Sequence, residues 1–135
     1  IFRPHNVYGR NMGNEHVIPE FIRKFKKLKN KKIFKIMGNG NEIRSFIHID
    51  HFISGFDKIF KKGRNQNIYN IGTSEKIKIK DLVNLMSKIL NKKVRVKKTK
   101  LLKGSPTKRC PDIYKIKKLG FKQKISLKEG IKIVL

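Results

Sequence analysis

Apolar residues recur along the chain with two different spacings, which predict alternating helices and strands. In residues 14–28 the apolar side chains lie three or four positions apart, as on one face of a helix. The same spacing predicts further helices at residues 50–62, 80–90, 112–119 and 127–134. Short apolar or alternating segments predict strands at residues 1–3, 32–37, 43–49, 67–71 and 94–96. Because strands and helices alternate, we predict an α/β fold.

Turn and cap residues indicate where these elements end. Pro19 falls in the first turn of its helix, where the missing N–H costs nothing. Gly38 opens a Gly-Asn-Gly-Asn turn between two strands. Asp50 is a candidate N-cap for the helix that follows it, and Gly63 a candidate stop. Residues 101–111 read as a loop. We find no repeat and no sharp boundary, so residues 1–135 are expected to form a single region.

Length and composition allow one folded domain and exclude several classes of protein. The chain has 135 residues, of which 38% are hydrophobic, which is enough for a core. It contains no apolar run of eighteen residues, so we expect no membrane span. Cys110 is the single cysteine, which excludes an internal disulfide and fits a reducing cytoplasm. The chain begins at Ile1, without Met, in a segment that resembles the middle of a strand. A truncated start or a processed terminus explains this.

The charge of the chain is strongly basic. It carries 35 Lys and Arg against 9 Asp and Glu, a net charge of +26. Such a balance favours polyanionic partners. However, seven of the 35 basic residues are Arg, and direct base readout favours Arg. Because the lysines are scattered, we favour a solvated lysine-rich surface with no nucleic-acid partner. A small basic nucleic-acid-binding domain stays as the alternative.

Several catalytic motifs are absent. The turn at Gly38 lacks the third glycine of a dinucleotide fingerprint and leads into a strand rather than a helix. The four histidines have no zinc-ligand spacing, so no metal site is expected. Tyr114 and Lys118 have the Tyr-x-x-x-Lys spacing of short-chain dehydrogenases. Lysine is so frequent here that we attribute this pair to chance, and we predict no catalytic residue in the chain.

Five stretches in order carry a more specific pattern. They are residues 3–9 (Arg-Pro-His-Asn-Val-Tyr-Gly), 12–22, 34–50, 68–82 and 104–131. Together they resemble the second half of the extended short-chain dehydrogenase/reductase family, the NAD-dependent nucleotide-sugar epimerases, dehydratases and decarboxylases. The resemblance implies the carboxyl-terminal substrate-binding part of an extended Rossmann-type NAD(P)-binding enzyme, with the last strands of the cofactor sheet. The amino-terminal dinucleotide-binding half would then be absent.

The resemblance assigns binding roles to individual residues. It places Asn6 by the sugar or diphosphate, since an amide both donates and accepts hydrogen bonds. Asn70 would lie near the nucleotide sugar. Arg44 and Arg109 would hold the diphosphate, because a guanidinium meets phosphate oxygens in pairs. The alternatives are an Asn that serves only its own loop, and a surface ion pair of Arg44 with Glu42 or Asp50.

The remaining roles concern the nucleotide. His16 and Val17, at the start of a helix, would contact it largely through the backbone. Phe34 and Met37, on one strand, would flank the base. The resemblance therefore predicts a nucleotide-diphosphate-sugar site without catalytic or cofactor residues.

For the complete enzyme the resemblance implies bound NAD and a cytoplasmic location. Family members are often homodimers, but the oligomeric state of this protein stays open. The base, the sugar and the reaction stay open. A stand-alone nucleotide-sugar-binding module is a further alternative.

Overall fold

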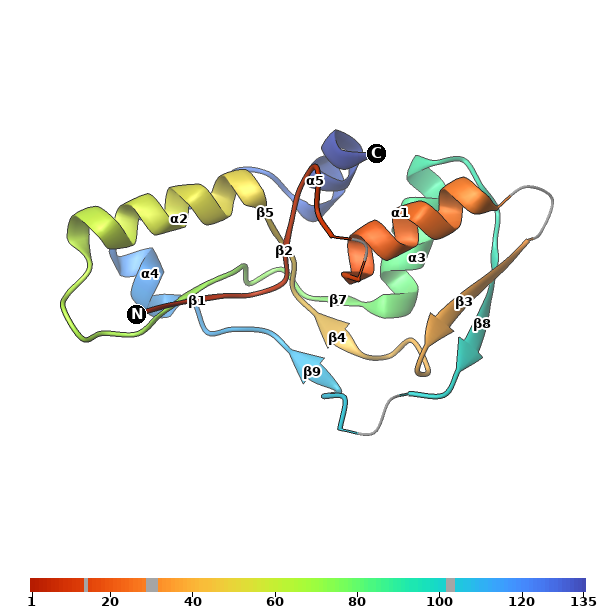
Figure 1. The fold of residues 1–135 in the computed structure, drawn as a ribbon, viewed down its shortest axis with the longest axis horizontal. Coiled ribbons are helices and arrows are strands. Elements are labelled where there is room, and N and C mark those ends of the chain that lie inside the picture. The colour runs from red at the N-terminus through yellow and green to blue at the C-terminus, as the bar shows by residue number, and fades with distance from the viewer. Residues whose placement is uncertain (14, 29–31, 102–103) are drawn as a thin grey trace. The chain divides into compact units, whose positions relative to one another are not determined.

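A computed structural model describes residues 1–13, 15–28, 32–101 and 104–135, and its elements confirm the α/β class (Figure 1). The helices are α1 (Val17–Lys27), α2 (Ile49–Lys62), α3 (Ile79–Ile89), α4 (Tyr114–Lys118) and α5 (Leu127–Val134). The strands are β1 (Phe2–Pro4), β2 (Val7–Tyr8), β3 (Ile33–Met37), β4 (Ile43–Arg44), β5 (Ile47–His48), β6 (Tyr69–Ile71), β7 (Ile77–Lys78), β8 (Arg95–Thr99) and β9 (Lys108–Arg109).

The chain divides into two compact units, each built from separate segments. The first unit comprises Ile1–Arg10, Ser45–Lys76 and Cys110–Val134. The second unit comprises Asn11–Arg44 and Ile77–Arg109, with Leu135. Each unit has its own strands, helices and buried residues, and each is described by itself below.

In the first unit, parallel strands are covered by helices. β1 pairs with β6 and β2 pairs with β5, both in parallel. α2 and α4 pack against β6, and α5 packs against β5. The core that results contains Ile47, Ile71, Ile113, Ile116 and Phe121, all at most 6% exposed.

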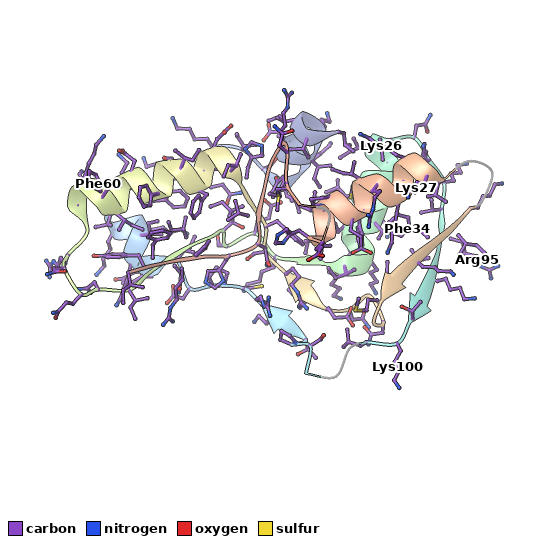
Figure 2. The ribbon with its side chains drawn as sticks, viewed as in Figure 1. Lys26, Lys27, Phe34, Phe60, Arg95 and Lys100 are labelled. Carbon is purple, nitrogen blue, oxygen red and sulfur yellow. The ribbon has the colours of Figure 1, made fainter. Side chains whose placement is uncertain are left out.

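In the second unit, β3 and β8 run side by side in parallel, and β4 is the centre of the three-stranded sheet β7-β4-β9 (Figure 1). β3 alternates exposed and buried residues, as a strand with one covered face must. Its buried Phe34 points toward α1, where its ring meets Phe25 at 4.5 Å and Phe21 at 5.1 Å between centroids (Figure 2). Leu82, Val83 and Met86 of α3 are fully buried in this unit.

Three of the predicted strands and loops need correction. The strand expected at 43–49 is interrupted after Arg44, and β4 pairs with β7 and β9 while β5 pairs with β2. Local hydrophobicity could not show this break, because Ser45 and Phe46 at the interruption are both buried. The loop expected at 101–111 contains β9, whose two exposed basic residues give no apolar signal. β8 extends to Thr99 rather than ending at Val96.

The helix predictions differ mainly at their ends. α1 begins at Val17 rather than at position 14, which lies outside the described residues. Asp50 is not the N-cap of α2. That place belongs to His48, whose Nδ1 accepts the N–H of Asp50 at 3.4 Å. Gly63 ends α2 as expected, and Pro19 lies in the first turn of α1.

Candidate functional site

Arg44 and Arg109 are brought together by strand pairing. β4 and β9 are parallel, and Arg44 is the register partner of Arg109. Register partners on adjacent strands project to the same side of the sheet, and the strands lie about 4.8 Å apart. Two like charges placed opposite each other are unfavourable by themselves. The pair therefore suits an anion that carries more than one negative charge.

The guanidinium of Arg44 is held in one orientation. It donates to the carbonyl oxygens of Ile43 and Pro106, both at 2.9 Å. The bond to Pro106 ties the half-buried group to the loop before β9, and β9 carries the exposed Arg109. The loop and both arginines thus belong to one local arrangement within the second unit.

A small cavity of about 130 Å³ in the second unit also has Arg44 in its wall. Its lining comes from α1, the end of β3, β4, the start of α3 and the loop after β8. The lining residues are Val17, Glu20, Phe21, Met37, Glu42, Arg44, Ile79, Leu101 and Ser105. Val17, Met37 and Arg44 were predicted as site residues, and the cavity brings these three together. We call it the α1–β4 cavity.

Glu42, in the wall of the α1–β4 cavity, is a buried carboxylate, whereas the sequence suggested it only as a surface ion-pair partner of Arg44. It is 6% exposed, and its two oxygens accept the N–H groups of Asn39 at 3.0 Å and Gly40 at 2.9 Å. Gly38 and Gly40 adopt φ of 81° and 83°, which favours glycine. A signal was present, because an acidic residue after a Gly-rich turn can accept the amides of that turn.

The turn at Gly38 does not fit a dinucleotide cofactor. A cofactor loop offers free backbone N–H groups to a pyrophosphate and leads into a helix. Here Glu42 occupies two of these N–H groups and the chain continues into β4. The residues of this turn therefore cannot hold NAD.

The expectation that Phe34 flanks a base together with Met37 needs correction. Phe34 is 1% exposed and is packed between the rings of α1, whereas Met37 is 49% exposed. Residues three apart on a strand point to opposite faces, so their side chains cannot share one face of β3. Phe34 packs against α1. Of the two residues, only Met37 lines the α1–β4 cavity.

His16 is exposed at the N-cap of α1 and makes no side-chain cap bond. Its carbonyl oxygen accepts the N–H of Glu20 within the helix. It does not line the α1–β4 cavity, although the adjacent Val17 does.

Asn6 and Asn70 both belong to the first unit. Asn6 has φ of 45° and donates from Nδ2 to the carbonyl of Ser45 at 2.8 Å. A non-glycine residue in this conformation is uncommon, and Asn is among those that tolerate it. Asn70 donates to the carbonyl of Asp112 at 2.9 Å, and its Oδ1 lies 3.3 Å from Nε2 of His5. Both amides therefore bond to their own unit.

The Tyr114–Lys118 pair lies on the short helix α4. Tyr114 is 60% exposed, and the ammonium of Lys118 lies over its ring at 4.5 Å from the centroid. This is a surface cation–π contact.

The described residues show neither a metal site nor a membrane span. Among them, no three His, Cys, Asp or Glu side chains gather as ligands. None of the helices in those ranges has the length and apolar character needed to cross a bilayer.

Comparison with known proteins gives a consistent result. Residues 1–72 match the NAD dependent epimerase/dehydratase family. The chain is 41% identical over 91 residues to dTDP-D-glucose 4,6-dehydratase of Dictyostelium discoideum, and 32% identical over 139 residues to the human protein of that name. These matches cover 67% and 98% of the chain.

Solved structures of similar fold include UDP-glucuronic acid 4-epimerase of Bacillus cereus with UDP-glucuronic acid and NAD (TM-score 0.87, 26% identity). Another is UDP-glucose 4-epimerase of Thermotoga maritima with UDP-glucose (TM-score 0.87, 27% identity). Each match covers 98% of this chain, and 42% and 43% of the solved chains. The chain spans only 20% and 39% of the two dehydratases. It belongs to the NAD dependent epimerase/dehydratase family.

Proposed function

We propose that this chain is the part of an NAD-dependent epimerase or dehydratase that holds the nucleotide diphosphate of a nucleotide sugar. The observation that carries this proposal is the register pairing of Arg44 with Arg109. A diphosphate between the two guanidinium groups would turn their mutual repulsion into charge-assisted hydrogen bonds with both. The α1–β4 cavity would take the base, since Arg44 lies in its wall.

α1 adds to the electrostatics of this arrangement. Val17 at its first turn lines the α1–β4 cavity, and the amino end of a helix carries a partial positive charge. His16 and Val17 would contact the nucleotide through their backbone, as the resemblance implies. For Asn6 and Asn70, both in the first unit, substrate-binding roles are proposed from the resemblance alone.

The chemistry of the complete enzyme is part of the same proposal. When bound, NAD would supply hydride transfer to and from a sugar carbon. The relatives include 4,6-dehydratases, 4-epimerases and a putative GDP-L-fucose synthase, which support a nucleotide-sugar substrate and leave the kind of reaction open. Residues of this chain would bind and orient the substrate. Binding energy from the nucleotide end of the substrate would then position its reacting sugar. A cytoplasmic location and a homodimer complete the proposal.

The test is nucleotide-sugar binding by the 135-residue chain. Isothermal titration calorimetry with UDP-glucose and dTDP-glucose measures it. Arg44→Ala and Arg109→Ala should each weaken binding by about tenfold to a hundredfold, because a hydrogen bond to a charged group contributes about 1.5–3 kcal/mol. Arg95→Ala is the matched control, since Arg95 is an exposed arginine of the same unit on β8 (Figure 2). An equal loss in the control would contradict the proposal.

Nucleic-acid binding is the second candidate, because the second unit concentrates the charge. Residues 11–44 and 77–109 hold 21 of the 35 Lys and Arg but only 4 of the 9 Asp and Glu. If this charge is functional, the chain will bind an oligonucleotide with an affinity that falls steeply with salt. That behaviour, together with no response to nucleotide sugars, would replace the first proposal.

A further inference from the structure

A lysine-lined groove of about 460 Å³ lies in the second unit, at the last turn of α1 and the first residues of β3. It is separate from the α1–β4 cavity, which adjoins the opposite ends of these two elements. Leu28, Ile33 and Phe34 form its apolar part. The other lining residues are five lysines, Lys24, Lys27, Lys32, Lys35 and Lys97. We call it the β3 groove.

Most of the positive charge in the β3 groove is uncompensated. Lys24 pairs with Glu20, and the other four lysines form no ion pair with any described residue. The positions outside the described ranges, 14, 29–31 and 102–103, hold no Asp or Glu. Lys35 and Lys97 are also register partners on the parallel β3–β8 ladder, where like charges repel. The β3 groove therefore favours an anionic partner.

β3 has an open hydrogen-bonding edge beside this groove. β8 pairs with one edge of β3, and no other strand of the described ranges pairs with it (Figure 1). Lys32 and Gly38 bond to the β8 side through their backbone. Because successive residues of a strand direct their backbone groups to opposite edges, Ile33 and Lys35 direct theirs away from β8. In agreement, the carbonyl oxygen of Lys35 accepts the ammonium of Lys24, a residue of the groove, at 2.9 Å.

We propose that the β3 groove binds an extended acidic segment of a partner protein, which adds as a strand to the open edge of β3. This inference goes beyond the proposed function and does not depend on it. Backbone hydrogen bonds to an edge strand give such a complex affinity, and side-chain contacts give it specificity. Acidic side chains of the segment meet the unpaired lysines, and its apolar side chains meet Leu28 and Ile33.

The charge of the β3 groove also selects among possible strands. Lysines on an edge strand oppose pairing with an identical edge, because a second copy of the chain brings the same positive charge. An acidic segment meets the opposite condition. The lysines that prevent self-association therefore favour an acidic partner.

Fluorescence anisotropy of the 135-residue chain with two labelled synthetic peptides tests the inference. The first probe is Glu-Val-Glu-Val-Glu-Val-Glu. The second probe, Glu-Pro-Glu-Pro-Glu-Pro-Glu, has the same charge but lacks the N–H groups that proline cannot supply to a ladder. We expect the first probe to bind about tenfold more tightly, because several backbone hydrogen bonds are lost in the second.

Variants locate the binding in the groove. Lys35→Gln and Lys97→Gln should each weaken binding of the first probe about threefold, the size expected for an exposed ion pair. Lys98→Gln is the matched control and should leave binding nearly unchanged, since Lys98 is exposed on β8 but does not line the groove.

A backbone variant tests the strand pairing itself. Ile33→Pro removes one N–H from the open edge at the first residue of β3, a position that tolerates proline. It should weaken the first probe more than Ile33→Ala, which removes the side chain but keeps the N–H. Urea midpoints of both variants show that the fold is kept.

Each contrary outcome has one meaning. Equal affinity of the two probes, or equal losses in Ile33→Pro and Ile33→Ala, overturns strand addition. An equal loss in Lys98→Gln shows diffuse attraction and overturns the role of the groove. Tighter binding of a thymidine oligonucleotide of the same charge, lost in the same lysine variants, makes nucleic acid the partner and overturns the proposal. None of these results affects the diphosphate site, which is tested with nucleotide sugars.

Discussion

Arg44 and Arg109 occupy opposing positions of the parallel β4–β9 ladder, although they lie far apart in the sequence. In the absence of a ligand this arrangement works against folding stability, because like charges directly across a ladder repel. A site that binds an anion has this property, whereas a purely structural ladder gains nothing from it.

Arg109→Gln should therefore stabilise the free chain slightly while it weakens binding. We expect the free energy of unfolding to rise by about 0.2–1 kcal/mol, the usual size of a cross-strand pair effect. Urea unfolding without ligand measures this change, and titration with UDP measures the loss of affinity. Arg95→Gln is the control. It removes the same charge from β8, where the register partner is the apolar Ile33 and no like-charge pair exists. A fall in stability on Arg109→Gln would show that the arginine is structural.

Replacing Phe34 with alanine should lower the free energy of unfolding much more than replacing Met37, because Phe34 is a core residue and Met37 a surface residue. Phe34→Ala deletes a buried ring between α1 and β3, for which the typical cost is about 3–5 kcal/mol. Met37→Ala should cost much less, because Met37 is 49% exposed. Denaturant midpoints of the two variants provide the comparison. Similar losses would mean that β3 does not bury Phe34 against α1.

The sequence predicted the element types well because apolar periodicity is a local property. The helices around Phe21, Leu82 and Ile131 were predicted because each has one buried stripe. Lys108 and Arg109 of β9 are both exposed, so this strand exists only through its pairing with β4. Pairing between distant segments leaves no trace in local hydrophobicity.

The same limit applies to the site. Motif order named Val17, Met37 and Arg44, which line one cavity in the structure, and their binding roles stay predictions. The prediction that Phe34 and Met37 flank one base conflicts with strand alternation, which places their side chains on opposite faces of β3. The burial of Glu42 was not predicted, because it depends on two backbone N–H groups of the preceding turn. The two units were not visible either, since each is assembled from segments that alternate along the chain.

Gly130 in α5 cannot be replaced without cost. The hydroxyl of the buried Tyr8 occupies the place where a β-carbon on Gly130 would lie. Gly130→Ala must therefore displace the Tyr8 ring, and overpacking of this kind costs about 1–3 kcal/mol. This exceeds the gain that alanine normally gives in a helix.

Gly13→Ala is the control for Gly130→Ala. A β-carbon at Gly13 would meet nothing within 4 Å. Thermal unfolding of both variants should show a lower midpoint for Gly130→Ala only. A raised midpoint for Gly130→Ala would mean that α5 and Tyr8 are not in contact.

His51 should make the stability of the chain sensitive to mild acid. The buried ring accepts the N–H groups of Lys124 at 2.9 Å and Ile125 at 3.2 Å, both at Nε2. A proton on Nε2 would face two donors. Burial is the main cause that lowers the pKa of His51 below 6.5, and the charges of His48 and Lys124 lower it further, while Asp50 opposes them.

The sign of this effect follows from the lowered pKa. Between the folded pKa and 6.5 the unfolded chain binds more protons than the folded chain, so acid favours unfolding. Stability should therefore be highest above pH 6.5 and should fall as the pH drops below that value. In His51→Gln the side-chain oxygen can still accept a hydrogen bond but no longer titrates, so urea midpoints should change less between pH 7 and pH 5. His16→Gln, at an exposed histidine, should keep the original pH dependence. If both variants change with pH as the original chain does, His51 is not the group that senses acid.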